Sequence, residues 1–190
     1  MIKNLVIITG SSGSGKSKII KYLYKDYKKI SVNSIKEKIF NKYYEKKDIL
    51  NGVSKKNITN KTLNIFWNSL EEEMQNNNNC MIEYPFGKWS VNKFNKLISK
   101  YNYNVILVIV YVSKYNLLNR RISRIERGER HRGHYDFMGK EKYLNFLKDK
   151  LKKSKKIDDI ETKKKYIKNY DLDLKNKKII IYDNNKTFNE

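Results

Sequence analysis

The stretch Gly10-Ser11-Ser12-Gly13-Ser14-Gly15-Lys16-Ser17 decides how this chain is interpreted. It matches the pattern G-x-x-x-x-G-K-S in full, follows an apolar run at residues 4–9 and precedes a segment with helical spacing. Glycines in such a loop let backbone N–H groups turn inward around phosphate oxygens. The sequence therefore predicts that residues 10–17 bind the phosphates of ATP, with Lys16 on the β- and γ-phosphates and the Ser17 hydroxyl on Mg²⁺.

The rest of the chain alternates between strand-like and helix-like apolar patterns. We expect strands at residues 4–9, 29–32, 80–83, 103–112 and 178–182, and helices at residues 16–24, 34–46, 62–75, 91–100, 114–127, 140–153 and 158–168. Strands separated by helices imply a mainly parallel sheet covered on both faces. The sequence thus predicts a three-layer α/β fold of the P-loop NTPase type, built as one domain over residues 1–190.

Composition and charge narrow the class of protein. The chain has 190 residues, of which 39% are hydrophobic and 13% aromatic, enough for a globular core, and its single cysteine excludes an internal disulfide. The formal net charge of +22 would attract anionic partners, and nucleic acid is one of them. Lysine, asparagine and isoleucine are all abundant, however, as an A+T-rich coding bias would produce. Such a bias spreads lysine over the whole surface, which weakens the argument from charge. With no apolar run long enough for a membrane helix and no signal-peptide pattern, we expect a cytoplasmic protein without a membrane partner.

A run of arginines stands out in the second half of the chain. Within thirteen residues it contains Arg120, Arg121, Arg124, Arg127, Arg130 and Arg132. In a chain otherwise rich in lysine this switch is informative, because guanidinium groups stay charged and stabilise a transferring phosphoryl group. Gly128 and Gly133 supply hinge-like freedom, so we predict an arginine-rich lid at about residues 127–139. The arginines expected to act in catalysis are Arg124, Arg127 and Arg130. A solvated basic helix is the alternative.

The loop and the arginine run together resemble the small P-loop kinases of nucleotides, nucleosides and antibiotics. Residues 127–133, Arg-Gly-Glu-Arg-His-Arg-Gly, resemble the lid segment of the chloramphenicol phosphotransferase group. Residues 10–17 are similar to the loop of polynucleotide kinase and of zeta-toxin-like kinases. The resemblance covers the organisation of the first 140 residues and is specific in these two segments. It implies an ATP- and Mg²⁺-dependent kinase with an acidic residue after the second strand, where it would activate the acceptor hydroxyl.

Asn33 occupies the place where the resemblance implies that acid. An amide cannot accept a proton as a general base, so this departure points to a different substrate, a relocated base or a lost activity. Glu83 is the candidate replacement, because it ends an expected strand at the edge where open α/β sheets bind ligands. It would act as general base or hold Mg²⁺ together with Ser17. An ordinary carboxylate facing solvent is the alternative for Glu83.

Three functions stay open from the sequence. The first is transfer of the γ-phosphate to a small acceptor, and a nucleotide or nucleoside is favoured because a nucleoside monophosphate needs no strong base. The second is phosphorylation of a polynucleotide end, or of an antibiotic hydroxyl. The third is a nucleotide-binding regulator without an acceptor, which the absence of a suitably placed Asn-Lys-x-Asp motif disfavours. Tyr84, Phe86 and Trp89 follow Glu83 and are candidates for one wall of an acceptor pocket, or for the core.

Overall fold

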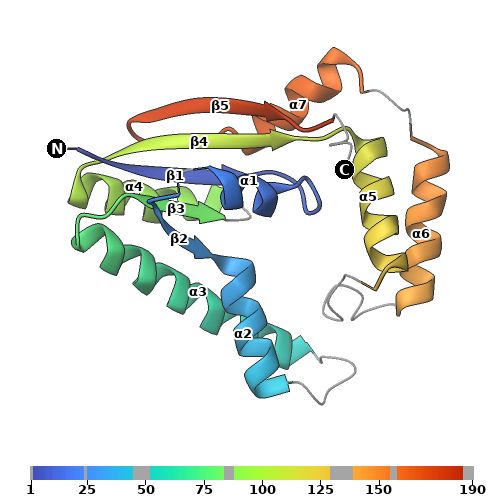
Figure 1. The fold of residues 1–190 in the computed structure, drawn as a ribbon, viewed down its shortest axis with the longest axis horizontal. Coiled ribbons are helices and arrows are strands. Elements are labelled where there is room, and N and C mark those ends of the chain that lie inside the picture. Colours follow the sequence, from blue (N-terminus) through green and yellow to red (C-terminus); the bar gives the residue numbers. More distant parts are fainter. Residues whose placement is uncertain are drawn as a thin grey trace.

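A five-stranded parallel sheet lies at the centre of the computed structural model (Figure 1). The structure describes residues 2–23, 25–44, 52–83, 88–128, 139–154 and 158–185. The strands are β1 (Lys3–Thr9), β2 (Lys28–Ser31), β3 (Cys80–Glu83), β4 (Tyr103–Tyr111) and β5 (Lys177–Asp183). Their order across the sheet is β2-β3-β1-β4-β5, and every neighbouring pair is parallel. Parallel neighbours need long crossover connections, which the helices provide.

The helices mostly follow the expected ranges. They are α1 (Lys16–Tyr22), α2 (Val32–Tyr44), α3 (Gly52–Gln75), η1 (Lys88–Ser90), α4 (Val91–Tyr101), α5 (Lys114–Glu126), α6 (Lys140–Lys152) and α7 (Ile160–Tyr170). The largest difference is α3, which begins at Gly52, ten residues before the expected start at residue 62. Its early turns are held by tertiary packing, since Ile58 is buried against Ile39 of α2. Every helix within the described ranges is too short or too polar to cross a bilayer.

The two faces of the sheet have separate cores. Leu5 and Ile7 of β1 are buried in a cluster with residues of α3, α4 and α7. Val6 and Ile8 point to the opposite face, where they pack with Ile19 of α1. This alternation follows from the two-residue period of a strand, and burying each such side chain stabilises the fold by roughly 1.5–3 kcal/mol. Helices on both faces of a parallel sheet confirm the expected three-layer α/β fold.

The carboxyl ends of the strands meet at one edge of the sheet. Residues 10–15 follow β1 there, α2 begins directly after β2, and Glu83 ends β3. The register of β1 and β3 pairs Ile8 with Glu83. At this end of the molecule α5 and α6 pack against each other as a helical pair (Figure 1). The topology therefore gathers the glycine-rich loop, the start of α2 and Glu83 at a single edge.

Candidate functional site

Space and backbone conformation both require glycine at two positions of the loop between β1 and α1. Gly10 has a φ of 141° and Gly15 a φ of 93°, a region that side-chain-bearing residues rarely adopt. A Cβ atom at Gly10 would come within 2.5 Å of the Val110 carbonyl oxygen, and one at Gly15 within 2.5 Å of Asn184 Nδ2. The loop thus packs closely against neighbouring strand ends. Only residues without a Cβ atom allow this close approach at Gly10 and Gly15.

Lys16 lies back over this loop. Its Nζ donates hydrogen bonds to the carbonyl oxygens of Gly10 and Ser11, both at 2.9 Å. The side chain is buried, and burial lowers the pKa of the ammonium, an effect that Glu83 opposes and Arg121 reinforces. A phosphate on the loop would compete with the two carbonyls for this ammonium. The Lys16 ammonium is therefore partly desolvated and lies beside the loop, where it could contact a bound anion.

Ser17, Asn33 and Glu83 come together where three strands end. Ser17 Oγ donates to Glu83 Oε2 at 3.3 Å, and Asn33 Nδ2 donates to Glu83 Oε1 at 3.4 Å. Glu83 is only 5% exposed, so it is not the solvent-facing carboxylate of the alternative interpretation. Asn33 lies beside this carboxylate at the start of α2. The position expected to carry an acid therefore carries an amide that contacts the acid of the neighbouring strand.

The oxygen atoms of Ser17 and Glu83 suit Mg²⁺. Mg²⁺ prefers hard oxygen ligands, and in nucleotide sites it is held by one or two protein groups while water and phosphate oxygens complete its shell. A hydroxyl and a buried carboxylate oxygen 3.3 Å apart match that donor set. No cluster of three or more His, Cys, Asp or Glu side chains forms a metal site in the described part of the chain. A metal at this position would therefore depend on nucleotide oxygens as well.

Two arginines of α5 that were not among the expected catalytic residues donate to main-chain carbonyl oxygens, one in the loop and one just after β5. Arg121 Nε donates to the Ser12 carbonyl oxygen at 2.9 Å, and Arg120 donates to the Asn184 carbonyl oxygen at 2.6 Å. Burial lowers the pKa of Arg120.

Arg124 and Arg127, two of the arginines expected in catalysis, are exposed. Arg130, residues 129–138 of the expected lid, Tyr84 and Phe86 all lie outside the described residues, whereas Trp89 is 63% exposed in η1.

Two residues that the sequence analysis did not single out form hydrogen bonds with main-chain groups of the loop. Asn184, just after β5, donates from Nδ2 to the Ser14 carbonyl oxygen at 2.7 Å. The Tyr166 hydroxyl on α7 accepts from the Ser11 N–H at 2.8 Å and donates to the Val110 carbonyl oxygen at 2.9 Å. These partners are separated by 170 and 155 residues in the chain. An isolated asparagine and tyrosine carry no local signal of such contacts, whereas Arg121 at least belonged to a visible arginine run.

Comparison with known proteins bears on the fold. No protein-family model matches the sequence, and no curated protein matches it either. The chain is similar in structure to a protein assigned as a kinase from Chloroflexus aurantiacus, with a TM-score of 0.71 and 16% identity over 97% of this chain and 90% of that chain. This likeness shows that the chain has the fold of a small P-loop kinase.

Two further solved structures give weaker matches. A sugar kinase from Janibacter sp. gives a TM-score of 0.49 at 10% identity, over 96% of this chain and 86% of that chain. Dephospho-CoA kinase from Campylobacter jejuni gives 0.43 at 20% identity, over 98% of this chain and 90% of that chain. Scores this low add nothing to the assignment of the fold. Because one fold hosts many activities, the function has to be argued from the site itself.

Proposed function

We propose that this protein is an ATP- and Mg²⁺-dependent phosphotransferase that moves the γ-phosphate to a small acceptor, a nucleotide or a nucleoside. The observation that carries the proposal is the meeting of three features at one edge of the sheet. These are the glycine-rich loop, the Lys16 ammonium lying over it, and the Ser17–Glu83 pair beside it. Each feature serves a different need of phosphoryl transfer, namely binding, charge neutralisation and a place for the metal.

The chain's own residues would do most of the work by positioning. Backbone N–H groups of residues 10–17 would bind the phosphate oxygens, and Lys16 would neutralise charge that develops during transfer. Mg²⁺ held by Ser17 and Glu83 would supply further neutralisation when bound. Arg121, which contacts the Ser12 carbonyl, would keep the outer turn of the loop in place. We expect Arg124, Arg127 and Arg130 to stabilise negative charge on the transferring phosphoryl group.

The environment of Glu83 favours an acceptor that is already a phosphate. Its two carboxylate oxygens are engaged by Ser17 and Asn33, an arrangement better suited to metal binding than to removing a proton from an alcohol. A nucleoside monophosphate brings its own nucleophilic oxygen and needs no such base. Asn33 could then orient the acceptor through its amide. Phosphorylation of a polynucleotide end is the second candidate, supported by the net charge of +22.

A screen of ATP consumption tests the proposal. The acceptors are nucleosides, nucleoside monophosphates, oligonucleotides with free ends and hydroxylated antibiotics. We expect acceptor-dependent turnover in the wild type and none in Lys16→Ala. Lys18→Ala is the matched control, because Lys18 is an exposed lysine on the same helix and should retain activity. ATP hydrolysis that no acceptor changes would favour a nucleotide-binding regulator, and a lack of saturable nucleotide binding would refute the proposal.

A further inference from the structure

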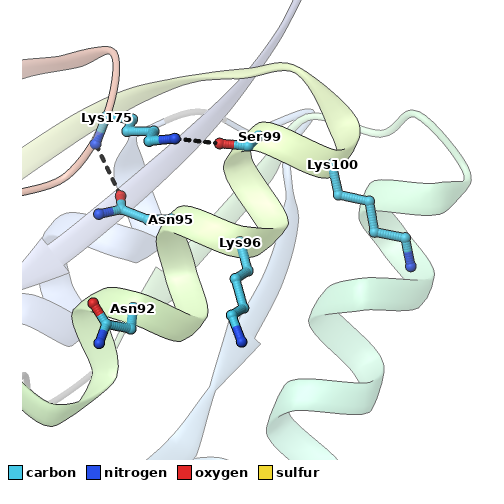
Figure 2. Close-up of a pocket in the computed structure, with 6 residues that line it drawn as sticks. All are labelled: Asn92, Asn95, Lys96, Ser99, Lys100 and Lys175. Atoms are coloured by element: carbon cyan, nitrogen blue, oxygen red, sulfur yellow. Dashed lines mark hydrogen bonds between the residues drawn. The ribbon is translucent and has the colours of Figure 1, made fainter.

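An open groove follows α4, on a part of the molecule that the proposed phosphotransfer does not use. Figure 2 shows this groove, which has a volume of about 740 Å³ and is called the α4 groove below. Its lining residues are Asn92, Asn95, Lys96, Ser99, Lys100 and Lys175. Five of them come from α4, and Lys175 comes from the segment between α7 and β5. All six residues are polar and three are cationic, a lining that favours an anionic partner.

The positive charge of the α4 groove is only partly neutralised. Lys100 Nζ pairs with Glu71 of α3 at 2.8 Å, and Lys175 Nζ donates to Ser99 Oγ at 3.1 Å. Lys96 forms no ion pair with any residue that the structure describes, and in Figure 2 its side chain extends away from α4. The sequence of α4 contains three lysines and no acidic residue. A strongly basic chain thus has a concave surface with cationic groups available for an anion.

Hydrogen bonds and buried leucines hold the segment between α7 and β5 against α4, on one side of the groove. Asn95 donates from Nδ2 to the Asp173 carbonyl oxygen at 3.0 Å and accepts from the Lys175 N–H at 2.9 Å (Figure 2 shows the second bond). Leu172 and Leu174, on the same segment, are buried in the main core. These contacts fix the segment against α4. The backbone of Lys175 therefore has a defined position beside the helix.

The chemistry and length of the α4 groove fit a nucleic-acid strand. Lysine, asparagine and serine side chains are among the usual donors to phosphate and sugar oxygens in protein–nucleic acid complexes. Asn92 and Lys100 are eight residues apart on a helix, a rise of about 12 Å. A groove of that length would accompany a short stretch of the phosphate backbone of one strand. We propose that the α4 groove binds the phosphate backbone of nucleic acid, whether or not the end of that strand is the acceptor of phosphotransfer.

Fluorescence anisotropy with a fluorescein-labelled oligothymidylate of about 20 nucleotides tests this proposal, in the absence of ATP and over a range of salt concentrations. The test variant is Lys96→Gln/Lys175→Gln, which keeps the backbone bond of Lys175. The control is Lys142→Gln/Lys153→Gln, which removes the same charge from exposed positions of and just after α6. Lys96→Gln alone provides a second variant that breaks no ion pair. Thermal melts establish that all four proteins, the wild type included, are equally folded.

We expect the test variant to bind roughly tenfold more weakly, and its slope of log K against log salt to shrink by about 1.4, since each phosphate contact on a single strand contributes about 0.7. The control should change binding less than about twofold with an unaltered slope. Equal weakening in both variants, or an unchanged slope in the test variant, would overturn the proposal. The proposal would also be overturned if polyglutamate competed with the oligonucleotide and bound the wild-type protein equally tightly. Wild-type ATP affinity in the test variant would separate this result from the fate of the proposed phosphotransfer.

Discussion

Truncating Asn184 to alanine should loosen the glycine-rich loop at residues 10–15 without disturbing β5, which ends one residue before Asn184. The side chain donates from Nδ2 to the Ser14 carbonyl oxygen at 2.7 Å, and the same amide nitrogen lies against Gly15. The main-chain contacts of Asn184 do not depend on its side chain. They are the bond from its N–H to the Tyr111 carbonyl oxygen at 2.9 Å and the bond from Arg120 at 2.6 Å. The alanine variant therefore removes the loop contact selectively.

The size of the effect follows from what the variant leaves unpaired. A buried carbonyl that loses its partner costs about 1–3 kcal/mol, and this bond is buried. Part of that cost is offset, because Asn184 Oδ1 is itself buried with no hydrogen-bond partner among the described residues, and the truncation removes it. We expect a net loss of about 1–2 kcal/mol in loop stability. If all of it appears in the nucleotide-binding conformation, ATP affinity should fall about 5- to 30-fold.

Isothermal titration calorimetry with MgATP measures the affinity, and urea unfolding measures the stability of the same samples. Asn185→Ala is the matched control, because Asn185 lies one residue further along. Its side chain accepts from the Ser113 N–H at 2.6 Å and donates to Asp183 Oδ1 at 2.7 Å, away from the loop. This control should lose stability while it keeps wild-type affinity. Wild-type ATP affinity in Asn184→Ala, or equal losses of affinity in both variants, would show that Asn184 does not position the loop.

Glu83→Gln keeps the shape of the side chain but removes its charge beside Ser17, so the Mg²⁺ concentration for half-maximal turnover should rise at least roughly tenfold. An unchanged requirement in a Mg²⁺ titration would exclude Glu83 as a ligand. Tyr166→Phe removes a hydroxyl that pairs two main-chain groups, so the free energy of unfolding in urea should fall by about 1–3 kcal/mol, and superimposable melts would contradict this. Burial lowers the pKa of Lys16 in the free protein, whereas a bound phosphate would favour its charged form. The complex then binds more protons, so ATP affinity should fall as the pH rises through that pKa. Calorimetry from about pH 7 to about pH 10 should show no such fall in Lys16→Ala.

Local patterns in the sequence were enough to predict the architecture. The apolar run before Gly10 and the glycine spacing through Gly15 indicated a strand followed by a tight glycine-rich loop, and the structure has both. Ser113 comes directly before α5, and its Oγ accepts from the Asn116 N–H, a helix cap made between residues three positions apart. These features depend on residues within a few positions of one another, so a single stretch of sequence records them. The start of α3 at Gly52 was missed because packing of Ile58 against α2, rather than helix-forming pattern, sustains those turns.

The roles of individual polar side chains depended on the tertiary structure. Asn33 departed from the expected acid, yet only the alignment of β2 beside β3 shows that its amide meets Glu83. Asn184 lies after the last strand and contacts a loop after the first, because β4 alone separates β5 from β1 in the sheet. The sequence by itself determined which segments become strands, helices and the glycine-rich loop, since those follow from short-range periodicity and glycine placement. Strand order and register decided which distant side chains share the site, because contacts between residues 50 or 170 positions apart leave no periodic trace in the chain.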